Sequence, residues 1–280
     1  MSKIFEVMRK DGAINIEEVH DERSGLPNAP IEQFAGLTGA PDVGSQETER
    51  LVSLRVSALA PIFPASAESH SAAAEQYRII RTKILHSAKK PRSIVVSSAC
   101  AGDGKTVTSI NIAASLSLKS TASVLLLDAD LRKPRIAELL GINVAPGLTD
   151  VLSGRASLAE AITRTREFPT LSILTSGEKT QNATELLDSE QWRRLIEEMK
   201  DRFSTVIMDA PPAAVLADYD LLQSTADGVI LVVRPDNTDR TACAKILQSI
   251  AKEKFLGVVL NCVPEWLLSK SSDYYYYATK

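Results

Sequence analysis

Six short apolar runs constrain the fold of this 280-residue chain more than any other feature. They are rich in Val, Ile and Leu, as strands buried on both faces of a sheet are. Between them lie stretches with apolar residues at helical intervals. This alternation predicts an α/β fold with a parallel sheet, helices on both of its faces, and ligands bound beyond the carboxyl ends of the strands. The predicted strands are 93–98, 123–128, 171–176, 205–210, 228–233 and 257–261, and the predicted helices are 104–119, 184–200 and 238–254.

Composition indicates one globular domain and says little about partners. The chain is 44% hydrophobic, enough for one sizeable core, and its 32 basic and 35 acidic residues are spread along it. We therefore expect no nucleic-acid partner. Three cysteines, far apart and without metal-ligand spacing, suit a reducing cytoplasm. No stretch has the pattern of a signal peptide or a membrane span, so membrane contact is expected only through a partner protein.

Residues 1–71 are predicted to form a largely flexible N-terminal extension, because Pro, Ala, Ser, Glu and Gly dominate there and large apolar residues are few. Two pieces interrupt it. The first carries Ile4, Phe5 and Met8 at helical spacing, and the second, residues 49–59, suits a short strand or a helix. We interpret both as transiently ordered segments, with docking peptides as the alternative.

A phosphate-binding loop follows the first predicted strand. That strand leads into "ACAGDGKT", residues 99–106, and then into a helix, which is the context that such a loop requires. Glycines let consecutive N–H groups face inward, and the helix N-terminus adds partial positive charge. Lys105 is expected to reach the β- and γ-phosphates of a nucleotide, and the Thr106 hydroxyl to bind Mg²⁺. The predicted nucleotide-binding residues of the loop are Ala101, Gly102, Asp103, Gly104, Lys105, Thr106 and Val107.

Three aspartates follow two other predicted strands. Asp128 and Asp130 come at the end of one strand and Asp209 at the end of another, so all three are expected to converge on the phosphate loop. The loop by itself fits nucleotide hydrolysis, phosphoryl transfer and a nucleotide-timed switch. One carboxylate beside Mg²⁺ is enough for hydrolysis. Two more suggest a proton acceptor for an incoming hydroxyl and a second ligand for the metal, which favours transfer.

The three segments together resemble a known family. "ACAGDGKT", "LLLDADLR" and "VIMDAP" are similar to the Walker A, Walker A′ and Walker B motifs of bacterial tyrosine kinases, which are P-loop autokinases of polysaccharide synthesis and export. The match runs from about residue 72 to the C-terminus. The resemblance implies a P-loop NTPase-type sheet, a kinase domain of residues 72–268, and ATP and Mg²⁺ as cofactors.

The resemblance also implies roles, residue by residue. It places phosphate at Lys105, a base for a tyrosine hydroxyl at Asp128, and Arg132 among the nucleotide-binding residues as the end of an Asp-x-Asp-x-Arg element. Further along, Ala183 stands where the family usually has a proline, a departure that affects the shape of the local loop. The implied catalytic residues are Lys105, Asp128, Asp130 and Asp209, and the implied Mg²⁺ ligands are Thr106, Asp130 and Asp209.

Four consecutive tyrosines, Tyr274, Tyr275, Tyr276 and Tyr277, lie in the polar C-terminal tail, residues 269–280. A terminal strand or an interface patch is the structural alternative. The resemblance implies that they are phosphate acceptors, since such kinases end in a tyrosine cluster that a neighbouring subunit phosphorylates. Each phosphate adds about −1.5 to −2 charges, so a modified tail is expected to leave an acidic site.

Glu75, Arg78 and Arg81 are spaced three residues apart along one stripe of a helix. The ordinary interpretation is an exposed charged face on which Glu75 pairs with Arg78. The spacing also matches the Glu-x-x-Arg-x-x-Arg oligomerisation motif of the family. The resemblance therefore implies a ring of identical subunits joined through this helix.

We predict a cytoplasmic protein-tyrosine autokinase that acts in trans within a ring and regulates exopolysaccharide or capsule synthesis and export. The resemblance implies a separate transmembrane activator, a polysaccharide co-polymerase, that holds the kinase at the inner membrane, and it admits other proteins as tyrosine substrates. One rival is a partition or division-site switch ATPase, whose signature lysine would stand at Cys100. A non-catalytic nucleotide-binding regulator is the other. Asn261, after the last strand, is a candidate for adenine recognition or for a turn.

Overall fold

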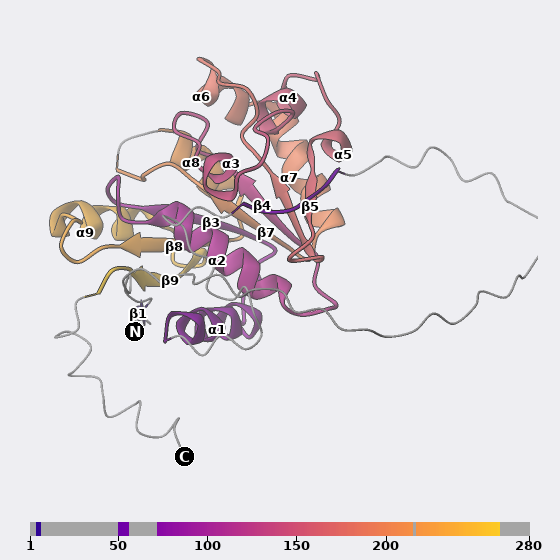
Figure 1. The fold of residues 1–280 in the computed structure, drawn as a ribbon. Helices are drawn as coiled ribbons and strands as arrows, with labels where there is room; N and C mark the ends of the chain where they lie inside the picture. The colour runs from indigo at the N-terminus through magenta and orange to yellow at the C-terminus, as the bar shows by residue number, and fades with distance from the viewer. Residues whose placement is uncertain (1–3, 7–49, 56–71, 215–216, 264–280) are drawn as a thin grey trace, which may run out of the picture. The chain divides into compact units, whose positions relative to one another are not determined.

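The structure is a computed structural model that describes residues 4–6, 50–55, 72–214 and 217–263. The strands in these ranges are β1 (Ile4–Glu6), β2 (Arg50–Val52), β3 (Ser93–Ser98), β4 (Val124–Asp128), β5 (Thr163–Thr165), β6 (Leu171–Leu174), β7 (Thr205–Asp209), β8 (Gly228–Val233) and β9 (Phe255–Leu260). They form one nine-stranded sheet in the order β1-β9-β8-β3-β7-β4-β6-β5-β2 (Figure 1). Neighbouring strands are parallel, except that β5 and β6 are antiparallel.

Helices cover both faces of the sheet, as the sequence predicts. They are α1 (Ala72–Leu85), α2 (Lys105–Ser117), α3 (Ile136–Leu140), α4 (Leu148–Leu152), α5 (Leu158–Ala161), α6 (Ala183–Leu187), α7 (Glu190–Arg202), α8 (Ala217–Thr225) and α9 (Arg240–Ser249). Within the described ranges, no helix combines the length and the apolar character needed to cross a membrane.

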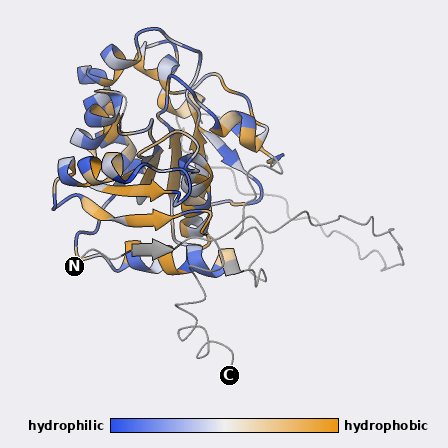
Figure 2. Cartoon of the chain, turned by 90° about the vertical axis from the view of Figure 1, so that its left-hand side faces the viewer, coloured by the Kyte–Doolittle hydropathy of each residue, from blue (hydrophilic) through white to orange (hydrophobic). Residues whose placement is uncertain are grey.

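Two apolar clusters, one on each face of the sheet, form the core. Side chains alternate along each strand, so that Ile94 and Val96 of β3 pack with α1, α2 and α3, whereas Val95 packs with the cluster that includes α4 to α9. Figure 2 shows the apolar strands in orange, with the helices around them. The central strands β3, β4, β6, β7 and β8 are therefore buried on both faces, which explains why they appear in the sequence as continuous apolar runs.

The predicted strands are confirmed, with ends that shift by no more than two residues. Two predicted helices are wrong in extent. The stretch 184–200 is interrupted, because the Ser189 hydroxyl accepts the N–H of Trp192 at 3.2 Å and so starts α7 as a separate helix after α6. The stretch 238–254 is helical only to Ser249, since Ile250 has an extended backbone.

Two segments of the predicted flexible extension belong to the sheet. Ile4–Glu6 pairs in parallel with β9, so the helix suggested by the spacing of Ile4 and Phe5 is wrong for these residues. Arg50–Val52 pairs in parallel with β5, which decides between the strand and the helix expected there. At the border of a sheet, unpaired backbone groups of the neighbouring strand outweigh a spacing of two or three apolar residues. The rest of residues 1–71 lies outside the described ranges, and the domain boundaries stay predictions.

The carboxyl ends of three neighbouring strands meet at one border of the sheet. β7 lies between β3, which leads into the phosphate loop, and β4. In the register of β4 with β7, Asp128 is paired directly with Asp209. The convergence of these aspartates on the phosphate loop, expected from the sequence, is therefore a property of the fold.

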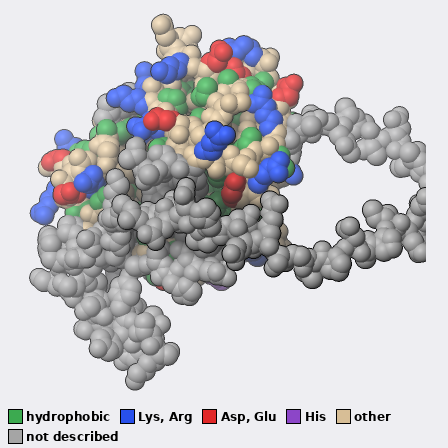
Figure 3. Space-filling view, viewed as in Figure 1, with side chains coloured by type: hydrophobic (Ala, Val, Ile, Leu, Met, Phe, Trp, Pro, Cys, Tyr) green, Lys and Arg blue, Asp and Glu red, His purple; other side chains and the backbone are tan. Residues whose placement is uncertain are grey.

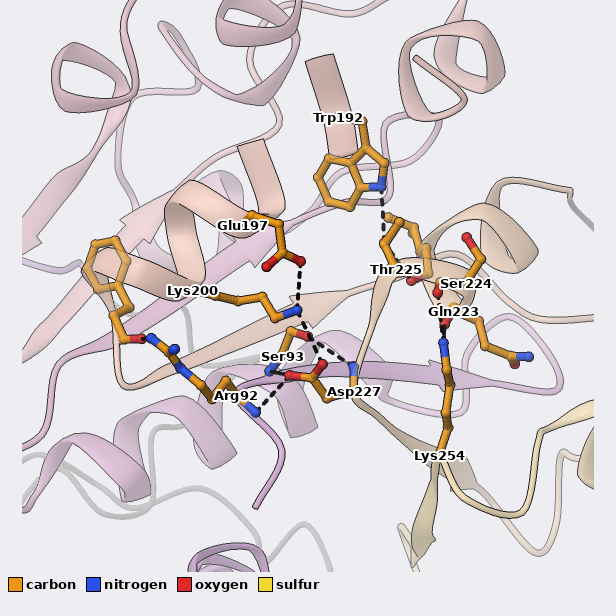
Figure 4. Close-up of polar contacts among 12 residues, drawn as sticks. Arg92, Ser93, Trp192, Glu197, Lys200, Gln223, Ser224, Thr225, Asp227 and Lys254 are labelled. Atoms are coloured by element: carbon orange, nitrogen blue, oxygen red, sulfur yellow. Dashed lines mark hydrogen bonds and ion pairs between the residues drawn. The ribbon is translucent and has the colours of Figure 1, made fainter. Parts of the chain in front are cut away.

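At the opposite border, polar side chains join the starts of β3 and β8 to α7 (Figure 4). Asp227 accepts the backbone N–H groups of Arg92 at 3.0 Å and Ser93 at 2.9 Å, and it pairs with Lys200 at 3.3 Å. Burial acts to raise the pKa of Asp227, but these N–H groups and Lys200 outweigh it and hold the pKa below its usual range. Nearby, the Lys254 ammonium donates to two carbonyls of α8 at 2.9 and 2.7 Å.

Asp227→Ala is expected to lower the free energy of unfolding near neutral pH by about 1–3 kcal/mol, because two strand-end N–H groups lose their acceptor. The pKa of Asp227 is lowered by folding, so its stabilisation is present above the unfolded pKa of about 3.9 and is lost as the pH falls through the folded pKa. Urea unfolding at neutral and acidic pH measures both effects.

Asp188→Ala is the matched control, because the pair of Asp188 with Arg193 is exposed on both sides. It is expected to change the free energy of unfolding by less than about 0.5 kcal/mol. Equal losses in the two variants would contradict a special role for Asp227.

Candidate active site

The phosphate loop connects β3 to α2. α2 begins at Lys105, and the loop before it is closed by Asp103, whose Oδ2 accepts the Cys100 N–H at 3.0 Å. Gly102 and Gly104 have φ values of 88° and 90°, in the left-handed region that favours glycine. The strand, loop and helix that the sequence predicts are therefore all present.

Two asparagines from other strand ends hold this loop. Asn237, after β8, donates to the Ala101 carbonyl at 3.1 Å and to Asp103 Oδ1 at 2.8 Å. Asn261, after β9, donates to the Asp103 carbonyl at 2.9 Å, and its amide occupies the space that a Cβ on Gly104 would need. Asn237 was not among the predicted site residues, because no sequence pattern indicates a contact between residues that are 136 positions apart. Asn261, considered for adenine recognition or a turn, supports the loop backbone.

Lys105 lies among the three predicted aspartates. Its Nζ is 2.9 Å from Asp130 Oδ2 and 3.8 Å from Asp209 Oδ2. Asp128, Asp130 and Asp209 are only 0, 3 and 1% exposed. One cation thus faces three buried carboxylates, and this excess of negative charge favours binding of a further cation.

Two buried carboxylate oxygens in this cluster, Asp128 Oδ1 and Asp209 Oδ2, have no hydrogen-bond partner among the described residues. The other oxygen of each of these two carboxylates accepts hydrogen bonds. Asp128 Oδ2 accepts the N–H groups of Arg135 at 3.1 Å and Ile136 at 2.9 Å, and Asp209 Oδ1 accepts the Ser109 hydroxyl at 3.2 Å. A buried carboxylate oxygen without a donor is costly unless a cation or a proton meets it. Asp128 Oδ1 and Asp209 Oδ2, the second of which lies 3.8 Å from Lys105 Nζ, are therefore the oxygens of this cluster that a further cation or a proton would meet.

The residues present fit Mg²⁺ bound together with a nucleotide. In such sites Mg²⁺ is held by one or two carboxylates, by phosphates and by waters. The Thr106 side chain lies close enough to Asp209 to act against the rise in the pKa of that carboxyl, so a hydroxyl and carboxylates lie together beside the phosphate loop. Over the described ranges, no group of three or more His, Cys, Asp and Glu side chains is arranged to bind a metal on its own. The assignment of Thr106, Asp130 and Asp209 to Mg²⁺ stays a prediction.

Burial sets the protonation behaviour of the cluster. It raises the pKa of Asp128 to about 7, with repulsion from Asp209 adding to the rise and the Ile136 N–H opposing it. Burial also raises the pKa of Asp209, against the attraction of Lys105. Burial acts to lower the pKa of Lys105, but Asp209 and Asp130 outweigh it and the pKa is raised. Lys105 therefore stays charged, while Asp128 is able to exchange a proton near neutral pH.

A cavity of about 280 Å³ lies between the phosphate loop and the turn after β4. Lys133 and Arg135 line it opposite the loop; neither is among the predicted residues, although the basic run "RKPR" beside Asp130 signals them. Asp128 and Asp209 are not among its lining residues. Elsewhere, Lys and Arg side chains are scattered among acidic and apolar ones over the described part of the face in Figure 3. The lining residues are Ala101, Gly102, Gly104, Lys105, Thr106, Val107, Asp130, Lys133, Arg135, Leu139 and Pro212.

Arg132 points toward α8 and α6. Its Nε lies 2.6 Å from Asp218 Oδ2, and its Nη2 donates to the Thr184 hydroxyl at 2.8 Å. The Thr184 hydroxyl in turn donates to Asp218 Oδ1 at 2.6 Å. Arg132 thus ties the turn after β4 to two helices and is not among the residues that line the cavity. Its predicted contact with the nucleotide stays a prediction.

The predicted oligomerisation residues lie on α1. Glu75 and Arg78 form the expected ion pair on α1 at 2.8 Å, and Arg81 is half-buried on the same helix. The pair agrees with the ordinary interpretation, an exposed charged face, and the ring stays a prediction. The tyrosines Tyr274, Tyr275, Tyr276 and Tyr277 lie outside the described residues.

The chain is similar to known proteins in sequence and in fold. A family model described as an AAA domain matches residues 91–255. The tyrosine-protein kinase YwqD of Bacillus subtilis (strain 168) is 37% identical over 220 residues, which are 77% of this chain and 91% of that protein. The crystal structure of the chimerical protein CapA2B2 has a TM-score of 0.67 and 28% identity, covering 72% of this chain and 90% of that one. The septum site-determining protein MinD complexed with Mg-ADP, from Pyrococcus horikoshii OT3, has a TM-score of 0.52 and 25% identity, covering 64% and 76%.

Gly104→Ala is expected to weaken binding of Mg-ADP about tenfold or more, because the new Cβ would overlap the Asn261 amide and displace the phosphate loop. Isothermal titration calorimetry measures the affinity. Gly154→Ala is the matched control: φ at Gly154 is 70°, also left-handed, but nothing lies within 4 Å of its Cβ position. Equal affinities for the two variants would show that the contact with Asn261 does not shape the loop.

Proposed function

Since the chain belongs to the bacterial tyrosine-protein kinases, we propose that it transfers the γ-phosphoryl group of Mg-ATP to the tyrosines of its own C-terminal tail. One observation carries the proposal. Lys105 Nζ lies 2.9 Å from Asp130, beside the paired Asp128 and Asp209, at the start of the helix that follows the phosphate loop. Groups suited to phosphate, to Mg²⁺ and to a proton thus share one site, as phosphoryl transfer requires.

Nucleotide binding is assigned to the phosphate loop and its surroundings. Backbone N–H groups of residues 101–107 and the N-terminus of α2 cradle the phosphates. Lys105 exchanges part of its pairing with Asp130 for the β- and γ-phosphates. Lys133 and Arg135, across the cavity, add positive charge around an anionic ligand.

Thr106, Asp130 and Asp209 are the proposed Mg²⁺ ligands; Asp209 Oδ2 supports this, since it accepts no hydrogen bond in the described ranges and has only the Lys105 ammonium, 3.8 Å away, as an ionic partner. When bound, Mg²⁺ offsets the charge of the β- and γ-phosphates. Ser109 orients the Asp209 carboxylate through its hydroxyl. Lys105 stabilises the negative charge on the phosphoryl group during transfer.

Asp128 is the proposed general base. Its Oδ1 takes the proton of the tyrosine hydroxyl while the phenolic oxygen bonds to the γ-phosphorus, the bond from phosphorus to the β-γ bridging oxygen breaks, and ADP leaves. Because Asp128 is 0% exposed and does not line the cavity, approach of a tyrosine requires the groups that cover its Oδ1 to move, while its Oδ2 stays held. Asp130, which lines the cavity, is the alternative base.

We further propose that the acceptor tail comes from a neighbouring subunit of a ring. The charged stripe on α1 supports this, since Glu75 is exposed and Arg78 partly exposed, so both can reach a partner as well as each other. A phosphorylated tail would be repelled by the buried carboxylates and would release the neighbour. Control of exopolysaccharide or capsule synthesis, a transmembrane activator and attachment to the inner membrane through it rest on the family resemblance alone.

The likeness to MinD favours a second candidate, a switch ATPase without kinase activity. Cys100 stands five residues before Lys105, where that class has its signature lysine, and this difference favours the kinase. ATP consumption without any phosphotyrosine would identify the switch.

Transfer between subunits is tested by mixing two chains, one without the catalytic lysine and one without the acceptor tyrosines, neither of which is expected to form phosphotyrosine alone. One carries Lys105→Met and keeps its tail; the other keeps Lys105 and has Phe at all four tail tyrosines. With ATP and Mg²⁺, phosphotyrosine is expected on the Lys105→Met chain, detected by immunoblotting and mapped by mass spectrometry. Each chain alone is the control and should give no signal. A signal in the unmodified protein but none in the mixture would contradict transfer in trans.

Asp128→Asn is expected to lower the rate of autophosphorylation about 100-fold or more, because an amide cannot take the hydroxyl proton. It can still accept the N–H groups that hold Asp128 Oδ2, so Mg-ADP affinity should stay within about threefold of the parent. Asp201→Asn, a change to an exposed carboxyl on α7, is the control and should leave the rate unchanged. Full activity of Asp128→Asn would contradict this assignment and favour Asp130 as the base.

A further inference from the structure

Residues 50–55, which we call the strap, bind the kinase core through backbone hydrogen bonds. β2 pairs with β5, and the N–H of Arg166 donates to the Val52 carbonyl at 3.0 Å. The Leu54 N–H lies 3.1 Å from each oxygen of the Glu167 carboxylate. The Leu54 side chain packs against the apolar cluster that contains α3.

The strap ends on the C-terminal end of α3. The Arg55 N–H donates to the carbonyl of Leu140, the last residue of that helix, at 2.9 Å. Gly141, the next residue, has φ of 63°, and a Cβ there would lie 2.7 Å from Arg55 Cβ and 2.9 Å from the Arg55 carbonyl oxygen. The helix end therefore requires glycine for its backbone shape and also for contact with the strap.

The other end of α3 holds the proposed base. The N–H groups of Arg135 and Ile136 donate to Asp128 Oδ2. α3 has only five residues, so Ile136 and Leu140 are separated by about 6 Å along the axis. Both side chains are buried, at 0 and 1% exposure, which makes the helix a rigid link between the strap and the Asp128 carboxylate.

We propose that the strap is a positioning element of the kinase: by holding the C-terminal end of α3, it fixes the N–H groups that orient Asp128 toward the acceptor hydroxyl. The inference rests on the role of Asp128 in the proposed function. It gives a catalytic purpose to a segment of the N-terminal extension that none of the phosphate-site motifs includes. Leu54 and Arg55 act through α3 and are positioning residues, since neither contacts the phosphate loop.

Arg55→Pro tests the link in the full chain, because proline lacks the N–H that binds the Leu140 carbonyl. Leu54, just before it, lies outside any helix, so the restriction that proline places on its neighbour is tolerable. Arg55→Ala keeps the N–H and is the matched control. We expect Arg55→Pro to lower kcat for autophosphorylation about tenfold, with KM for ATP and affinity for Mg-ADP within about threefold of the parent. Arg55→Ala should match the parent in all three quantities.

A second pair of variants guards against misfolding of Arg55→Pro. Glu167→Ala removes the acceptor of the Leu54 N–H, whereas Glu167→Gln keeps an oxygen there; both changes are on the surface. We expect kcat to fall about threefold in Glu167→Ala and to be restored in Glu167→Gln. If Arg55→Pro loses Mg-ADP binding, the kcat values of Glu167→Ala and Glu167→Gln decide whether the strap positions Asp128.

The outcomes separate two failures. An unmodified protein that forms no phosphotyrosine would overturn the proposed function. An active protein whose kcat is unchanged or increased by detaching the strap would overturn the positioning role and leave the kinase assignment intact. In Glu167→Ala, a parallel fall in kcat and in Mg-ADP affinity would also overturn the positioning role, since general loss of structure gives that result.

Discussion

The pairing of β4 with β7 places two buried carboxylates, Asp128 and Asp209, side by side at the carboxyl border of the sheet. Like charges in a poorly solvated place repel each other and raise each other's pKa. Lys105 from α2, the Ser109 hydroxyl and the first N–H groups of α3 each offset part of this charge. What is left is a negative site that is able to take a cation and a proton. The chemistry that we assign to the protein is a consequence of that imbalance.

A site of this kind has to be held by its surroundings, because loops at strand ends have few backbone hydrogen bonds of their own. Side chains from other elements hold the catalytic segments. Asn237 and Asn261 hold the phosphate loop from the ends of β8 and β9. Arg132 ties the turn after β4 to Asp218 on α8. The strap, residues 50–55, binds the far end of α3.

The chain is similar both to a tyrosine-protein kinase, YwqD, and to the septum site-determining protein MinD complexed with Mg-ADP. The phosphate loop and Asp209 suit either one, since both bind a nucleotide with Mg²⁺. The proposed base, Asp128, is what distinguishes a kinase in our proposal, and this carboxylate is 0% exposed in the structure.

Much of the fold could be predicted from the sequence, because strands buried on both faces must be apolar throughout and the helices between them must be amphipathic. The phosphate loop and the three aspartates could also be predicted from the sequence, since each lies within one or two residues of a strand end. One error arose where a contact distant in the chain decided local structure: Ile4–Glu6 is a strand because it pairs with β9. A second error was local, because the periodicity of 184–200 did not take into account that Ser189 can cap a new helix.

The sequence by itself determined which residue types gather at the carboxyl border of the sheet: a glycine-bearing loop, a lysine, a threonine and three aspartates. Only the tertiary structure decided which oxygen of each aspartate is held, that Lys133 and Arg135 line the cavity, that Asn237 holds the phosphate loop and that the strap binds α3. Local patterns follow from hydrogen bonding and burial along a few residues, whereas these contacts join segments that the chain separates by up to 136 positions and that only folding brings together.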